Sequence, residues 1–142
     1  GSLLIPNVEL WGHRNMPEVI HFAKEGTWGA KVINELAPRR GDTVIQKSRG
    51  NAFYKTYLED FLRERSIKCV LLTGLSANGC ILATSVGALE RGFYSVWVKD
   101  CIDNDPKTFE WLGNRFPIFQ SKDIMETWED MKDSKTVGVK SE

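Results

Sequence analysis

Short apolar runs alternate with segments of helical periodicity from residue 29 onward. Four runs have the length and composition of buried strands, at 43–47, 69–73, 94–98 and 117–119. Five other segments are predicted helices, at 29–37, 56–65, 79–91, 106–114 and 122–132. Strands that alternate with helices favour right-handed βαβ crossovers. We therefore expect an α/β fold, a three-layer α/β/α sandwich around a mainly parallel sheet.

Local signals agree with these helix boundaries. Thr56 and Ser121 are candidate N-caps, Pro106 suits a first helical turn, and Gly92 suits the end of a helix. The length of 142 residues predicts a single domain, which we place at 1–132, followed by a flexible polar tail at 133–142.

The first 28 residues lack the periodicity of the rest of the chain. Proline and glycine interrupt them, and only 19–23 is expected to form a short element. The chain opens with Gly-Ser and no initiator Met, which indicates a processed or artificial end, or a fragment.

Charge and apolar content exclude several classes of function. Nineteen basic residues balance nineteen acidic ones, so neither nucleic acid nor an anionic membrane is an expected partner. No apolar run approaches the roughly 20 residues of a membrane span, and no signal-peptide pattern begins the chain. These features predict a cytoplasmic protein that binds a small molecule or another protein.

Three cysteines, Cys69, Cys80 and Cys101, form no CxxC pair, and only two histidines accompany them. This inventory suggests neither a zinc site nor a disulfide framework. For Cys69 and Cys101 we expect ordinary packing in the fold. A thiol redox site is disfavoured, because neither of them has the spacing of a resolving cysteine for Cys80.

The segment TGLSANGC, at 73–80, follows the second predicted strand, and ligands of open parallel sheets bind at such carboxyl ends. It lacks the GxGxxG pattern of a dinucleotide-binding loop. It also departs from the G-x-S-x-G nucleophile elbow, because its second glycine comes one position late and both histidines precede Ser76. Neither of these two motifs explains the turn.

Cys80 is the stronger chemical candidate in this turn. The amides and dipole of a helix that starts near Asn78 or Gly79 would favour a thiolate and would donate to an oxyanion. The alternative is that Cys80 simply packs at the junction of strand and helix, because free cysteines are among the most buried residues. Lys47 ends another predicted strand, where a cation would stabilise that thiolate, or would be an ordinary solvated lysine.

Three segments together resemble the isochorismatase-like cysteine hydrolases, which include nicotinamidases and N-carbamoylsarcosine amidohydrolases. They are GTWGA at 26–30, VIQKSRGNAFYKTYLEDFLRERSIK at 44–68 and GLSANGCILATSVGALERGF at 74–93. The resemblance extends over roughly 24–132. It implies a Rossmann-like topology and hydrolysis of a C–N, amide-type bond in a small molecule through an acyl-enzyme.

The resemblance also implies roles for individual residues. Cys80 is the implied nucleophile, Lys47 its cationic partner, and the backbone amides of Ser76 and Cys80 form the oxyanion hole. The peptide bond between Leu75 and Ser76 is implied to be cis. We expect Phe53 and Asn78 to contribute to substrate binding.

The sequence departs from the family in one respect that bears on activity. The family's general base is an aspartate near the N-terminus, and no Asp precedes Asp42 here. The resemblance implies a first strand, a first helix and a second strand that have no counterpart upstream of residue 24. We therefore expect the domain to be N-terminally incomplete. The family's metal-binding residues belong to this missing part, so we expect no metal and no cofactor. We expect either that a further N-terminal segment supplies the acid or that a homo-oligomer covers the exposed sheet edge. The alternative function is a non-catalytic binding or assembly module.

Gly87 is a second departure, because many family members carry an acidic residue at this position. Glycine inside a helix costs roughly 1 kcal/mol relative to alanine. We therefore expect either a close contact or a lost function at Gly87.

Overall fold

The computed structural model describes residues 26–103 and 106–137. Contacts divide the chain into two units, 1–49 and 50–142, and each is described by itself. The predicted element at 19–23 lies outside the described residues. The proposed domain boundaries stay a prediction.

The described part of the first unit contains two short 3-10 helices, η1 (Trp28–Ala30) and η2 (Asn34–Leu36). The predicted helix at 29–37 is therefore wrong. Lys31 and Ile33 adopt extended dihedrals between the two turns. Ala37 is also extended, because the following proline disfavours helical geometry in the residue before it.

The predicted strand at 43–47 is also corrected. This segment joins no β-ladder among the described residues, and Val44 is 65% exposed. An apolar run shows that a segment is suited to burial in a sheet. It does not supply the neighbouring backbone with which a strand must pair.

The second unit contains a parallel three-stranded sheet in the order β1-β2-β3. The strands are β1 (Cys69–Gly74), β2 (Tyr94–Ile102) and β3 (Ile118–Phe119). Cys69 pairs with Tyr94, and Trp97 pairs with Ile118. Three of the four predicted strands are therefore confirmed, and the fold class is α/β, as predicted.

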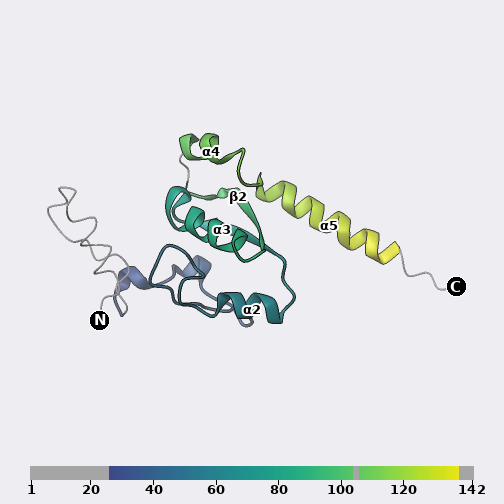
Figure 1. The fold of residues 1–142 in the computed structure, drawn as a ribbon. Coiled ribbons are helices and arrows are strands. Elements are labelled where there is room, and N and C mark those ends of the chain that lie inside the picture. The colour runs from purple at the N-terminus through teal and green to yellow at the C-terminus, as the bar shows by residue number, and fades with distance from the viewer. Residues whose placement is uncertain (1–25, 104–105, 138–142) are drawn as a thin grey trace. The chain divides into compact units, whose positions relative to one another are not determined.

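Helices lie on both faces of this sheet (Figure 1). They are α2 (Leu58–Glu64), the π-helical turn η3 (Ala77–Ile81), α3 (Leu82–Leu89), α4 (Pro106–Leu112) and α5 (Ser121–Val137). Ser95 and Trp97 of β2 face α3, whereas Val96 between them faces α5. The sheet is thus sandwiched between helices.

The ends of the helices follow two of the four predicted signals. Pro106 is the first residue of α4, and Gly92 has a φ of +76° just after α3. The N-cap of α2 is Tyr57 rather than the predicted Thr56, whose hydroxyl accepts a hydrogen bond from the Leu58 amide at 3.3 Å. Ser121 is the first helical residue of α5 rather than its cap, and α5 continues to Val137, into the predicted tail.

A buried cluster joins α3 and α4 to the central strand. Trp97 is fully buried, stacks on Phe116 at 5.5 Å between ring centroids, and meets Phe109 edge-on at 6.2 Å. Its indole nitrogen donates to the Ser85 hydroxyl, which is also bonded to Ser95 at 2.8 Å. The network satisfies the buried polar atoms of all three side chains.

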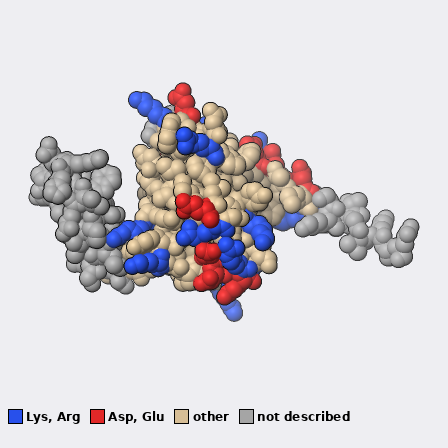
Figure 2. All heavy atoms as spheres, in the orientation of Figure 1, with Lys and Arg blue, Asp and Glu red and all other residues tan. Residues whose placement is uncertain are grey.

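Charged side chains of both signs intermingle around α2 (Figure 2). Glu59 accepts from Arg63 at 2.8 Å and from Arg91 at 2.9 Å, which ties α2 to the end of α3. The hydrogen bond from Arg63 is the main cause that lowers the pKa of Glu59.

Asp100 in β2 holds the start of α5. Its carboxylate accepts from the Ser121 amide at 2.7 Å and from the Ser121 hydroxyl at 2.5 Å. These bonds, the hydroxyl first, lower the pKa of Asp100 below its ordinary value of 3.8. A lowered pKa in the folded state stabilises the fold above pH 3.8, and the contribution is lost as pH falls through the folded-state pKa.

We therefore expect Asp100→Asn to lower the free energy of unfolding at about pH 6 and to have less effect at about pH 3. Urea unfolding of both proteins at the two pH values measures this. Asp130→Asn, which removes the same charge from an exposed carboxylate in the later part of α5, is the control for a general effect of charge. An equal loss at both pH values would contradict the assigned cause.

Candidate functional site

The turn after β1 has a backbone geometry of its own. Gly74 ends the strand with a φ of +108°, a region that glycine enters without steric cost. The peptide bond between Leu75 and Ser76 is cis, which confirms the expectation drawn from the resemblance. The chain then enters η3 at Ala77.

Cys80 lies in this π-helical turn. The Ser76 carbonyl accepts from the Gly79 amide at 3.1 Å and from the Ile81 amide at 3.2 Å, and the second bond spans five residues. The Cys80 thiol is partly buried. Single π turns inside helices are frequent at functional sites. The prediction that Cys80 lies in the opening turn of a helix is confirmed.

Asp103, which the sequence analysis did not single out, fastens this turn to the sheet. Its carboxylate accepts from the Ala77 amide at 2.6 Å, and its own amide donates to the Gly74 carbonyl at 3.2 Å. Asp103 comes directly after β2, so its position at the carboxyl end of the neighbouring strand was a usable signal. It is a positioning residue for the turn.

Asp103→Ala should lower the free energy of unfolding by about 1–3 kcal/mol, because the amide of the buried Ala77 would lose a charged acceptor. Asp103→Asn, which keeps an acceptor oxygen, should lose less. Urea unfolding compares the two variants. Equal losses in the two variants would contradict the assigned role of the acceptor oxygen at position 103.

The loop at 50–56 forms a wall beside Cys80. Thr84 of α3 donates to the Gly50 carbonyl at 3.3 Å and accepts from the Ala52 amide at 3.1 Å. A Cβ placed on Gly50 would stand 3.7 Å from Cys80 Cα and 3.9 Å from its sulfur. The loop backbone therefore passes directly next to the cysteine.

Gly87 explains how this loop approaches α3. A Cβ at Gly87 would stand 2.6 Å from both Nδ2 and Oδ1 of Asn51, which confirms the expected close contact. Asn51 is held in turn, because its Oδ1 accepts from the Phe53 amide at 2.9 Å. A side chain at position 87 would therefore require the Asn51 side chain to move.

Gly87→Ala should lower the free energy of unfolding by about 1–3 kcal/mol, despite the roughly 1 kcal/mol that alanine gains in a helix. The double variant Gly87→Ala/Asn51→Ala removes the clash and should be more stable than Gly87→Ala alone. Thermal and urea unfolding of the three proteins test this. A single variant more stable than the parent would overturn the role of the contact.

The role of Phe53 in substrate binding stays a prediction. Its side chain is 5% exposed, stacks on Phe93 at 5.9 Å, and belongs to an apolar cluster with Leu62 and Ala88. The ring is therefore enclosed by core side chains in this structure. The sequence located the loop correctly, but could not tell which way the ring points.

Asn78 and Lys47, two further predicted site residues, lie in different units of the chain. Asn78 is exposed in η3, and its Oδ1 accepts from the Ser76 hydroxyl at 3.4 Å. Lys47 donates to the Arg49 carbonyl at 2.9 Å and belongs to the first unit. Its pairing with Cys80 therefore stays a prediction.

Cys69 and Cys101 are both exposed, so the expectation that they are packed is wrong. Cys69 lies at the start of β1 and Cys101 near the end of β2, and the structure covers both positions only in part. No group of three or more His, Cys, Asp or Glu that could hold a metal occurs within 26–103 and 106–137. Among these residues there is also no helix long and apolar enough to cross a membrane.

Comparison with known proteins agrees with this geometry. Residues 8–109 match the family model described as Isochorismatase domain. The chain belongs to the isochorismatase family. The maleamate amidohydrolase of Pseudomonas putida is 31% identical over 97 residues, which cover 58% of this chain and 46% of that protein. The N-carbamoylsarcosine amidase of Arthrobacter is 31% identical over 109 residues, which cover 73% of this chain and 41% of that protein.

A solved structure of a family member has the same fold. The N-carbamoylsarcosine amidase of Thermoplasma acidophilum superposes with a TM-score of 0.71 at 29% identity, over 82% of this chain and 65% of that chain. This chain thus spans less than half the length of the two curated relatives and under two thirds of this structure.

Proposed function

We propose that this isochorismatase-family chain carries the nucleophile of a cysteine amidohydrolase. One observation carries the proposal: Cys80 lies in a π-helical turn at the carboxyl end of β1, fastened by Asp103 and flanked by the Gly50 loop. A reactive group in a turn fixed from several sides is preorganised for attack.

In the proposed reaction the Cys80 thiolate attacks the carbonyl carbon of an amide-type group. The oxygen becomes an oxyanion, which the amides of Ser76 and Cys80 are proposed to stabilise. The C–N bond breaks, the amine leaves with a proton, and water hydrolyses the thioester to release the acid and regenerate the thiol. A general base must take up and return the proton, and Lys47 is the proposed cationic partner.

The names of the two curated relatives support a substrate class for this proposal. Maleamate and N-carbamoylsarcosine, which their names contain, both carry a terminal CONH₂ group. We propose that this protein acts on a small molecule of the same kind and releases ammonia. Ammonia assays with both compounds test this, and release with neither would remove them as substrates.

Selective alkylation tests the site without a known substrate. The protein is treated briefly with iodoacetamide near neutral pH, and the modified cysteine is mapped by mass spectrometry. Cys69 and Cys101 are more exposed than Cys80, so they serve as internal controls. Faster labelling of Cys80, slowed in Lys47→Ala, supports an activated thiolate. Labelling of Cys80 no faster than the two controls would refute the activated nucleophile in this chain.

The second candidate is a binding or assembly module that keeps the fold without turnover. Asp42 is the first Asp of the given sequence, whereas the resemblance implies an Asp as general base in an earlier strand. Unreactive Cys80 together with no ammonia release would support this second function.

A further inference from the structure

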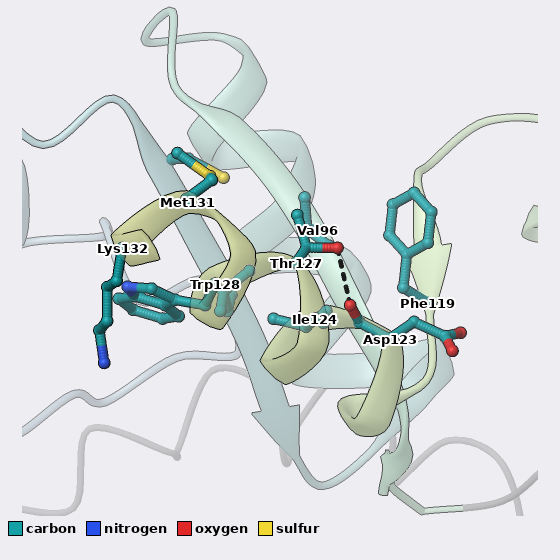
Figure 3. Close-up of a pocket in the computed structure, with 10 residues that line it drawn as sticks. Val96, Phe119, Asp123, Ile124, Thr127, Trp128, Met131 and Lys132 are labelled. Atoms are coloured by element: carbon teal, nitrogen blue, oxygen red, sulfur yellow. Dashed lines mark hydrogen bonds between the residues drawn. The ribbon is translucent and has the colours of Figure 1, made fainter. Parts of the chain in front are cut away.

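An open groove of about 740 Å³ lies between α5 and the sheet (Figure 3). Leu71 and Phe119 of the sheet and Trp128 of α5 are among the apolar side chains that line it. Its lining includes no residue of the loop at 50–56 or of η3, which holds Cys80. The room for a substrate at the cysteine is therefore set by the immediate neighbours of its sulfur.

Gly50 stands next to this sulfur, although the fold does not require a glycine there. Its φ lies outside the range from +20° to +160°, in which other residues are strained. Beyond the neighbouring residues of the chain, the atom closest to a Cβ at Gly50 would be Ala83 Cβ at 3.6 Å, an ordinary van der Waals contact. Gly87 differs, because a Cβ there would stand 2.6 Å from Asn51. Alanine would fit at position 50, so packing does not explain this glycine.

The space that Gly50 leaves open has fixed boundaries. A Cβ in it would stand 3.7 Å from Cys80 Cα and 3.9 Å from the sulfur. On the opposite side, Thr84 holds the loop by donating to the Gly50 carbonyl and accepting from the Ala52 amide. Thr84 follows Cys80 by four residues, about one helical turn, so neighbouring turns carry the cysteine and the clamp on the facing wall.

The position of this space suits an atom that reacts with the sulfur. Reacting atoms in a near-attack geometry are roughly 3–3.5 Å apart. The Cβ position at Gly50 is only slightly farther from the Cys80 sulfur, at 3.9 Å. A carbonyl carbon that approached the sulfur from this side would therefore overlap with a methyl group fixed at position 50.

We propose that Gly50 is a specificity-determining residue, which keeps this space open for the carbonyl group that Cys80 attacks. The proposal rests on the proposed function, because it assigns the space to that reaction. A Cβ fills the space at contact distance, so the space is about one carbon atom wide. A flat terminal CONH₂ group fits it, whereas a fixed side chain at position 50 takes the place of the substrate.

Alkylation of the Gly50→Ala variant with iodoacetamide measures the space without a known substrate. The thiolate sulfur forms a bond to the CH₂ carbon of the reagent as iodide leaves, and the reagent carries a CONH₂ group of its own. The rate constant of Cys80 is taken at high pH, where labelling no longer rises with pH, and is divided by that of Cys69. This ratio should fall by about tenfold or more. The urea midpoint should stay at or above that of the parent, because alanine fits without strain.

Gly113→Ala is the matched control, since it adds the same methyl group directly after α4, outside the Cys80 turn. It should leave the labelling ratio unchanged. A ratio in Gly50→Ala within about twofold of the parent overturns the proposal, as does an equal fall in Gly113→Ala. A lowered urea midpoint in Gly50→Ala would also overturn it, because the glycine would then serve the fold.

Failure of the proposed function would be a separate result. It would be seen in the parent protein near neutral pH, as labelling of Cys80 no faster than that of the exposed cysteines. The comparison of Gly50→Ala with the parent instead uses the plateau at high pH, where the thiols are ionised in both proteins. The ratio therefore reports the room beside the sulfur, whether or not Cys80 is activated.

Discussion

Cys80→Ser is expected to reduce ammonia release from an accepted amide substrate by at least about 10³-fold. The serine hydroxyl has nearly the shape of the thiol but does not ionise near neutral pH, so the turn keeps its geometry and loses its nucleophile. The free energy of unfolding should change by less than about 1 kcal/mol. Steady-state assays of the purified variant, with its unfolding curve, measure both effects.

Cys69→Ser is the matched control, because it makes the same chemical change at an exposed cysteine in β1. It should keep the parent activity. Turnover by Cys80→Ser close to that of the parent would refute Cys80 as the nucleophile, even if the protein remained a hydrolase. Activity lost equally in both variants would point to damage to the fold.

Trp97→Ala should lower the free energy of unfolding by about 3–5 kcal/mol, a large share of the 5–15 kcal/mol typical of a domain. Trp97 is fully buried in the central strand, between the rings of Phe116 and Phe109. Its removal leaves a cavity and takes away the indole donor to Ser85. Urea unfolding at equilibrium measures the loss.

Trp97→Phe keeps one aromatic ring and removes the indole N–H together with part of the ring volume. Its loss should therefore be smaller than that of Trp97→Ala, about 1–3 kcal/mol. A Trp97→Ala variant that unfolds at the parent's urea midpoint would contradict the central place given to this side chain.

The strands were predictable because their signal is local. The apolar runs at 69–73, 94–98 and 117–119 match β1, β2 and β3 at their first residues within one position. The run at 43–47 has the same composition but joins no ladder among the described residues. Composition reports suitability for burial, whereas a ladder also needs a partner backbone from elsewhere in the fold.

The site was predictable where a single segment builds it. The sequence placed Cys80 in the opening turn of a helix, and the family resemblance implied the cis bond between Leu75 and Ser76. Contacts between distant segments could not be obtained in this way. Asp103 lies 26 residues from the amide it binds, and the ring of Phe53 is turned into the core.

Taken by itself, the sequence determined the α/β class, most elements of the second unit and the turn that holds Cys80. Only the tertiary structure decided that Asp103 fastens this turn, that Asn51 fills the space left by Gly87, and that apolar residues of the sheet and α5 line an open groove. The physical reason is the separation along the chain of the residues that determine each feature. Helix and strand patterns depend on neighbours along the chain, whereas burial, clefts and anchoring hydrogen bonds depend on which distant side chains the fold brings together.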